Sequence, residues 1–164
     1  MTGFSIDLGA LSSGSSRVRV ESQPHELGLP PDLWSGTVVG ALDVERSGDR
    51  ISVRGTLEAR ARVECVRCLR GYELEVEAPL ELFAERAGTG FRFDEVELER
   101  DDYMMFHDGR HLDLREEARE ALLLELPMAP HCREDCLGLC SRCGADRNEA
   151  PCRCEGPVAE PTTR

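Results

Sequence analysis

Eight cysteines are the residues of this chain whose type and spacing could do chemistry. Six of them lie between residues 130 and 154, and the other two form a C-x-x-C pair much earlier. Thiols at this density either form disulfides or bind a metal ion as thiolates. The first residues show no charged segment followed by a long apolar run, so we expect a reducing cytoplasmic location, which favours metal binding over disulfides.

The clearest metal-binding pattern is formed by the last four cysteines. Cys140 and Cys143 are two residues apart, which lets both sulfurs reach one ion, and Gly144 can adopt the positive φ angle that such a turn needs. Cys152 and Cys154 follow after a loop and complete a set of four thiolates. Four thiolates form a closed structural zinc site with no open position for catalysis. Because C-x-C is a less usual spacing, the identity of the fourth ligand stays open at this point.

The remaining thiols belong to Cys65, Cys68, Cys132 and Cys136. They could form a second zinc site that ties two distant segments together, and His131 could replace one thiol. The alternatives are a simple reduced pair at Cys65 and Cys68, or a redox-active dithiol there. A redox C-x-x-C normally lies at a helix N-terminus, whereas this pair lies between two strand patterns, so redox activity ranks last. We therefore expect structural zinc, as one or two ions.

Two long alternating patterns flank the early C-x-x-C pair. Apolar or small residues occupy every second position of residues 51–65, with charged or polar residues between them, and residues 72–82 repeat the alternation. A period of two is typical of strands with one buried face. The sequence therefore predicts a long antiparallel hairpin with the C-x-x-C pair in its turn, and the expected register places Arg60 opposite Glu77.

Other elements complete the expected fold. Residues 38–45 alternate as a further strand, and residues 85–110 have the character of an acidic loop that could include a short strand. Asp113 is expected to cap a helix whose apolar residues recur at helical spacing and which Pro127 ends.

The predicted fold class is α+β: an antiparallel β-meander sheet with a C-terminal helix packed on it and a small cysteine-rich zinc-binding module. We expect the sheet and helix in residues 1–127, the zinc module in residues 128–154 and a disordered tail in residues 155–164. No segment has the apolar length that a bilayer-spanning helix requires, so no membrane partner is expected.

The charge of the chain restricts its partners. The formal net charge is −12, from 32 acidic and 20 basic residues, and every basic residue is Arg. Residues 128–154 contain four Arg and four acidic residues, so the negative charge lies in the rest of the chain. Such a chain is repelled by nucleic-acid phosphates and attracted to basic partners. No nucleophile motif or phosphate-binding glycine loop accompanies the histidines, so we expect neither an enzyme nor a small-molecule substrate.

Several segments in combination resemble the YceD-like proteins, a family called the large ribosomal RNA subunit accumulation proteins. The resemblance covers about residues 36–154. The segments are V-R-G-T-L at 53–57, E-C-V-R-C-L at 64–69, L-D-L at 112–114, L-E-L-P-M-A-P at 124–130 and C-R-E-D-C-L-G-L-C-S-R-C-G-A-D-R-N at 132–148.

The resemblance implies a bacterial, cytoplasmic, non-enzymatic factor for large-subunit ribosomal RNA accumulation and ribosome assembly. Its implied partners are a ribosomal protein, an assembly factor or the pre-ribosomal large subunit. The alternatives are a zinc protein that binds RNA directly and a thiol redox protein that uses Cys65 and Cys68. Family members vary in how many cysteines they keep, which argues against a universal activity at these residues. The resemblance carries over Cys65, Cys68 and the C-terminal cysteines as metal ligands, and no catalytic residue.

Overall fold

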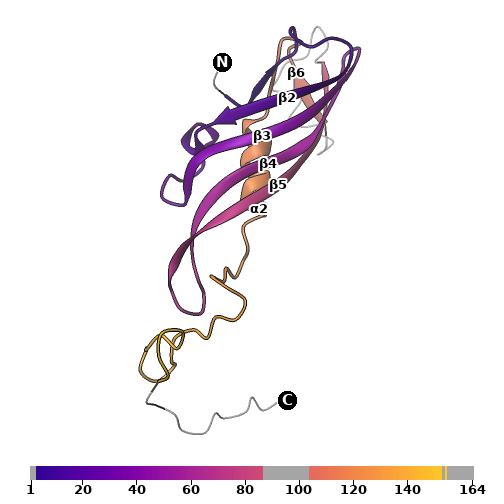
Figure 1. The fold of residues 1–164 in the computed structure, drawn as a ribbon. Helices are drawn as coiled ribbons and strands as arrows, with labels where there is room; N and C mark the ends of the chain where they lie inside the picture. Colours follow the sequence, from indigo (N-terminus) through magenta and orange to yellow (C-terminus); the bar gives the residue numbers. More distant parts are fainter. Residues whose placement is uncertain (1–2, 87–103, 153, 155–164) are drawn as a thin grey trace. The chain divides into compact units, whose positions relative to one another are not determined.

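The computed structural model describes residues 3–86, 104–152 and 154. Its main sheet has five strands in the order β2-β3-β4-β5-β6 (Figure 1). A second sheet pairs β1 with β7 in antiparallel orientation. The strands are β1 (Ser5–Asp7), β2 (Gly14–Ser22), β3 (Trp34–Ser47), β4 (Arg50–Glu64), β5 (Gly71–Arg86), β6 (Met104–His107) and β7 (His111–Asp113).

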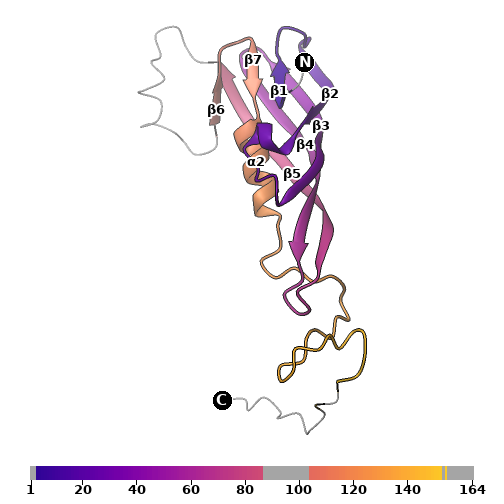
Figure 2. The same cartoon turned by 90° about the vertical axis from the view of Figure 1, so that its left-hand side faces the viewer.

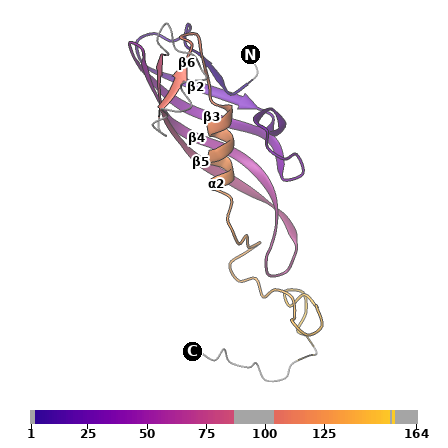
Figure 3. The same ribbon diagram turned by 180° about the vertical axis from the view of Figure 1, so that it is seen from behind.

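Helix α2 (Arg115–Leu124) covers one face of the main sheet. It lies behind the strands in Figure 1 and in front of them in Figure 3, and Figure 2 shows the short 3-10 helix η1 (Pro24–Leu27) beside it. Buried side chains alternate along β4 and β5, and α2 adds Ala118 and Leu122, both fully buried. Alternating apolar residues thus form the inner face of the sheet. The predicted α+β arrangement of sheet and helix is confirmed.

The expectation of a wholly antiparallel meander is wrong at the edge of the sheet. Strand β6 pairs with β5 in parallel, with Phe83 opposite Met104 and Arg86 opposite His107. A tight hairpin turn forces antiparallel pairing, whereas a connection of a dozen or more residues allows a parallel one. Residues 87–103 separate these two strands, and the acidic loop expected there lies outside the described residues.

The start of α2 also differs from the expectation. Leu114, not Asp113, occupies the N-cap position and makes no side-chain capping bond. Asp113 is instead the last residue of β7, and its carboxylate accepts a hydrogen bond of 3.1 Å from the backbone N–H of Arg115. Asp113 thus bonds a free N–H of the first helical turn, as a capping residue does, but it lies one residue before the N-cap position.

Charged pairs cross the solvent face of the β4 and β5 strands, as the alternating pattern predicted. Arg60 pairs with Glu75 at 3.8 Å, and Arg54 pairs with Glu81 at 2.7 Å. The partner of Arg60 is thus two residues away from the expected Glu77. The Arg50–Glu85 ion pair and the hydrogen bond from the Cys65 N–H to the Arg70 carbonyl follow the same register as these two pairs, so the hairpin register expected from sequence was wrong by two residues.

The chain divides into two compact units. Unit 1 comprises Met1–Ala61 and Leu74–Leu126, and unit 2 comprises Arg62–Glu73 and Pro127–Arg164. The tip of the hairpin therefore belongs to the same unit as the cysteine-rich segment. The disordered tail expected at 155–164 lies outside the described residues. Within the described parts of the chain, none of the helices has the length and apolar character needed to cross a membrane.

Gly55 offers a test of the packing between β3 and β4. It lies opposite Leu42, and a Cβ added there would be 2.1 Å from the Ala41 carbonyl oxygen. Because this neighbour is backbone, we expect Gly55→Ala to lower the free energy of unfolding by about 2–3 kcal/mol. Urea unfolding followed by the fluorescence of Trp34, the single and buried Trp, measures the loss. The control is Gly71→Ala, where nothing lies within 4 Å; equal midpoints for both variants would contradict the close approach.

Candidate metal centres

Unit 2 brings the eight cysteines together in two groups of four. We call Cys65, Cys68, Cys132 and Cys136 the buried set, and Cys140, Cys143, Cys152 and Cys154 the exposed set. Within each set the four sulfur atoms all lie within 4.8 Å of one another. All eight cysteines are free thiols, and His131, which is exposed, belongs to neither set. The structure thus brings together the same two groups of four cysteines that were considered from the sequence.

The distances between sulfur atoms fit metal thiolates better than disulfides. In the buried set, the Sγ atoms of Cys65 and Cys136 are 3.8 Å apart, and those of Cys68 and Cys132 are 3.7 Å apart. A disulfide requires about 2.05 Å. A tetrahedron with zinc–sulfur bonds of about 2.3 Å has sulfur–sulfur edges of about 3.8 Å, which is the spacing of the buried set. The exposed set is tighter, with Cys152 Sγ at 3.3 Å from the sulfurs of Cys140 and Cys143.

Both sets begin with the same backbone turn. The first cysteine donates its N–H to the carbonyl five residues later and accepts the N–H of the residue four positions later. The bonds are Cys65 to Arg70 (2.9 Å), Leu69 to Cys65 (2.8 Å), Cys140 to Ala145 (2.8 Å) and Gly144 to Cys140 (2.8 Å). The residue after the second cysteine has a positive φ angle, 57° at Leu69 and 72° at Gly144. The expected role of Gly144 is confirmed, whereas Leu69 was missed because leucine rarely adopts this conformation.

The hairpin tip is fastened to the segment that carries the other two ligands of the buried set. Val66 donates its N–H to the Pro130 carbonyl at 2.9 Å, and Leu139 donates to the Arg67 carbonyl at 2.9 Å. Gly138 has a φ angle of 70°, and a Cβ there would meet the Arg67 carbonyl oxygen at 2.9 Å. Glycine at this position thus permits the close approach of the two segments.

Hydrogen bonds and burial give the thiols within each set different pKa values. Backbone N–H groups, first that of Cys132, outweigh burial and lower the pKa of Cys65 to about 6. The N–H groups of Cys143 and Arg142 lower the pKa of Cys140 to about 6 in the same way. Burial raises the pKa of Cys132 to about 12. One thiol of each set thus ionises readily, and a divalent cation would supply the positive charge that complete ionisation needs.

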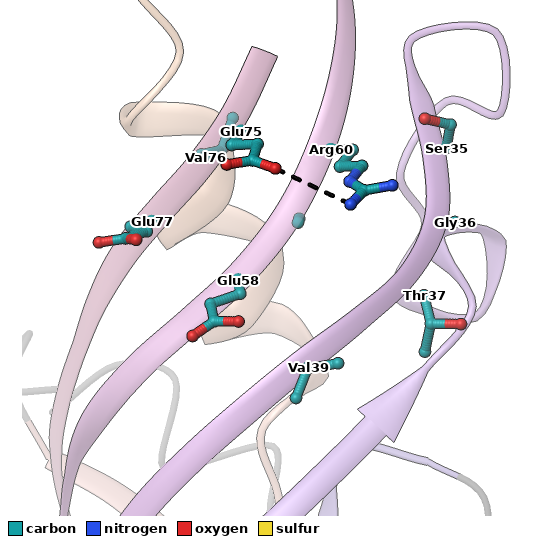
Figure 4. A pocket seen from close by; sticks show the side chains of 10 residues that line it. Ser35, Gly36, Thr37, Val39, Glu58, Arg60, Glu75, Val76 and Glu77 are labelled. Carbon is teal, nitrogen blue, oxygen red and sulfur yellow. Dashed lines mark ion pairs between the residues drawn. The ribbon is translucent and has the colours of Figure 1, made fainter. Parts of the chain in front are cut away.

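A hollow of about 290 Å³ on the solvent face of unit 1 is a second candidate site (Figure 4). It is lined by residues of β3, β4 and β5, among them Glu58, Arg60, Glu75 and Glu77. Arg60 and Glu75 pair with each other across it. Glu58 and Glu77 form no ion pair within the described residues, so their carboxylates are available to a cationic group. Sequence reasoning missed this hollow because it adjoins a register irregularity in β3 that the alternation does not reveal.

Comparisons with known proteins identify one family. A family model described as "Large ribosomal RNA subunit accumulation protein YceD" matches residues 53–162. An uncharacterised protein of Mycobacterium leprae is 37% identical over 112 residues, which cover 68% of this chain and 49% of that protein. An uncharacterised protein of Mycobacterium tuberculosis is 37% identical over 111 residues, covering 67% and 51%.

A more distant relative carries a functional name. The "Large ribosomal RNA subunit accumulation protein YCED homolog 1, chloroplastic" of Zea mays is 25% identical over 181 residues, covering 92% of this chain and 60% of the maize protein. The chain spans about half the length of the mycobacterial relatives it matches. No solved structure matches the chain.

Proposed function

Because this chain belongs to the YceD family of large ribosomal RNA subunit accumulation proteins, we propose that it is a non-enzymatic factor for accumulation of that RNA. It acts through contacts with a ribosomal protein, an assembly factor or the pre-ribosomal large subunit. The observation that carries the proposal is the extent of the family match, 53–162, which includes most of β4, all of β5 and α2, and both cysteine sets. The maize relative, named for the same process, supports it.

In this proposal each cysteine set holds a structural zinc ion. The buried hydrophobic side chains of unit 2, among its described residues, are Cys65, Cys68 and Cys136. A unit this small with so little apolar burial cannot fold by the hydrophobic effect alone. A bound metal ion is one of the few sources of stability that can replace a hydrophobic core. Thiolates are soft ligands that suit zinc, and four of them leave no open position for catalysis.

The partner in this proposal is basic. The chain carries a net charge of −12, and at the hollow of unit 1 Glu58 and Glu77 have no ion-pair partner in the part of the chain that the structure describes. Ribosomal proteins as a class need positive charge to bind RNA, so they complement such a surface.

Two observations disfavour the alternative functions. Arg67 donates to the Cys136 carbonyl at 3.0 Å, and Arg70 pairs with Asp146 at 3.3 Å, so these cations already have partners within unit 2. Together with the ion pair of Arg133 and Asp135 at 3.3 Å, these contacts reduce the positive charge that unit 2 offers to RNA. Cys65 is fully buried, so an oxidised substrate has no access to the sulfur that a redox reaction would use.

Affinity purification of the tagged chain from its native cells tests the proposal. At low salt we expect large-subunit proteins or precursor particles to co-purify, and to be lost as salt rises. The double variant Glu58→Gln/Glu77→Gln should reduce their recovery about tenfold. The matched control Glu45→Gln lies on the same solvent face outside the hollow and should retain recovery. Recovery of no large-subunit component by the zinc-loaded chain would overturn the proposal.

A further inference from the structure

The loop that joins the two cysteine pairs of the exposed set reaches a ligand of the buried set. In this loop, residues 144–151, Asn148 points its amide Nδ2 at Cys136 Sγ, 3.5 Å away. The Oδ1 atom of the same side chain accepts the Leu137 N–H at 2.8 Å and Arg133 Nη2 at 2.7 Å. Two donors on one side fix the position of the oxygen, so the NH₂ group faces the other way, where its two hydrogens can serve Asp146 Oδ1 at 2.6 Å and the sulfur.

Further contacts hold this loop against the segments that carry the buried set. Arg70, two residues after Cys68, pairs with Asp146 at 3.3 Å and with Glu149 at 3.2 Å. Arg147 donates its N–H to the Gly138 carbonyl at 3.0 Å. Ion pairs between exposed side chains stabilise weakly. Closing the two ends of the loop therefore adds to the restraint that the backbone hydrogen bonds provide.

We propose that Asn148 is a positioning residue that couples the two sets, so that metal binding by the exposed set strengthens metal binding by the buried set. The proposal rests on the zinc sites proposed above. Four thiolates on one divalent ion carry excess negative charge, and an N–H donor to a sulfur reduces that charge and orients the ligand. Metal at the exposed set closes both ends of the loop and so holds the amide on Cys136. By linkage, metal at the buried set strengthens binding at the exposed set equally.

Cobalt(II) titration of the full chain, followed by the sulfur-to-cobalt charge-transfer absorption, tests this coupling. The double variant Cys143→Ser/Cys152→Ser disables the exposed set. Asn148→Ser removes the amide donor and adds no charge, whereas an aspartate would set a carboxylate against that of Asp146, which accepts from the Asn148 amide at 2.6 Å. We expect each change to weaken cobalt binding by the buried set about 10- to 100-fold, and their combination to weaken it no further. Asn148→Ser should also shift the absorption band of the buried set, which a purely structural effect would not do.

The controls separate this coupling from general damage. Glu149→Gln removes an ion pair with Arg70 but contacts no sulfur, so cobalt affinity should stay within about twofold. Asn148→Ala is a second variant without the amide donor in case the serine hydroxyl donates to the sulfur in its place. Additive losses, or an unchanged buried set after the exposed set is disabled, would overturn the coupling. Failure of the unsubstituted chain to bind cobalt or zinc at all would instead overturn the proposed metal sites.

Discussion

Cys136→Ser should reduce bound zinc from two ions per chain to one and unfold the hairpin-tip part of unit 2, while unit 1 keeps its cooperative unfolding transition. Serine offers no thiolate, and the three remaining sulfurs of the buried set cannot close a tetrahedral site. Structural zinc contributes about 10 kcal/mol or more at pH 7, far more than the few buried side chains of unit 2 could replace. Elemental analysis after purification under reducing conditions measures the stoichiometry.

Trypsin reports the loss of order, because it cleaves after Arg and the segments that carry the buried set contain Arg67, Arg70 and Arg133. We expect cleavage at these residues to accelerate at least tenfold in Cys136→Ser, since local unfolding exposes them. Leu137→Ser is the matched control, because this neighbouring side chain is 57% exposed and contributes no ligand. Two zinc ions in Cys136→Ser, or trypsin resistance in the zinc-free protein, would refute a structural role for metal at the buried set.

The strands and the cysteine sets were predictable from sequence for different reasons. The strands follow from local alternation, because residues such as Val53 and Leu57 must share one buried face. The cysteine sets follow from chemistry: eight thiols in so short a unit have few arrangements that avoid disulfides. The pairing of Cys65 and Cys68 with Cys132 and Cys136 was an inference by elimination, and the structure places these four sulfurs together.

The features that sequence reasoning missed depend on contacts between distant residues. The parallel pairing of β6 depends on the path of the connection before it, which no local pattern encodes. The positive φ angle of Leu69 becomes predictable only when its turn is compared with that of Gly144, which has the same spacing after a C-x-x-C pair. The contact of Asn148 with Cys136 could not be foreseen, because an asparagine in a polar loop is ordinarily a turn residue.

Lowering the pH from 7 to 5 should release zinc from both sets while unit 1 stays folded. Only thiolates bind zinc, so protons compete with the metal and its affinity falls as pH falls. The pKa values of Cys65 and Cys140 are about 6, so both are thiolates at pH 7 before metal binds and thiols at pH 5. Below pH 6 metal binding must therefore displace one more proton from each set. The zinc affinity of each set then falls by about a further tenfold for each pH unit.

Unit 1 responds to acid at lower pH because its well-bonded carboxylates titrate there. The backbone N–H of His111 holds the pKa of Asp108 below its usual value, and the Arg115 side chain does the same for Asp113. A lowered folded-state pKa gives stability that is complete above the unfolded value of about 3.9 and is lost as pH falls through the folded value. At pH 5 both carboxylates therefore still stabilise unit 1. A colorimetric chelator and Trp34 fluorescence, followed in one acid titration, should change in that order; loss of both signals together, or zinc retained at pH 5, would contradict this account.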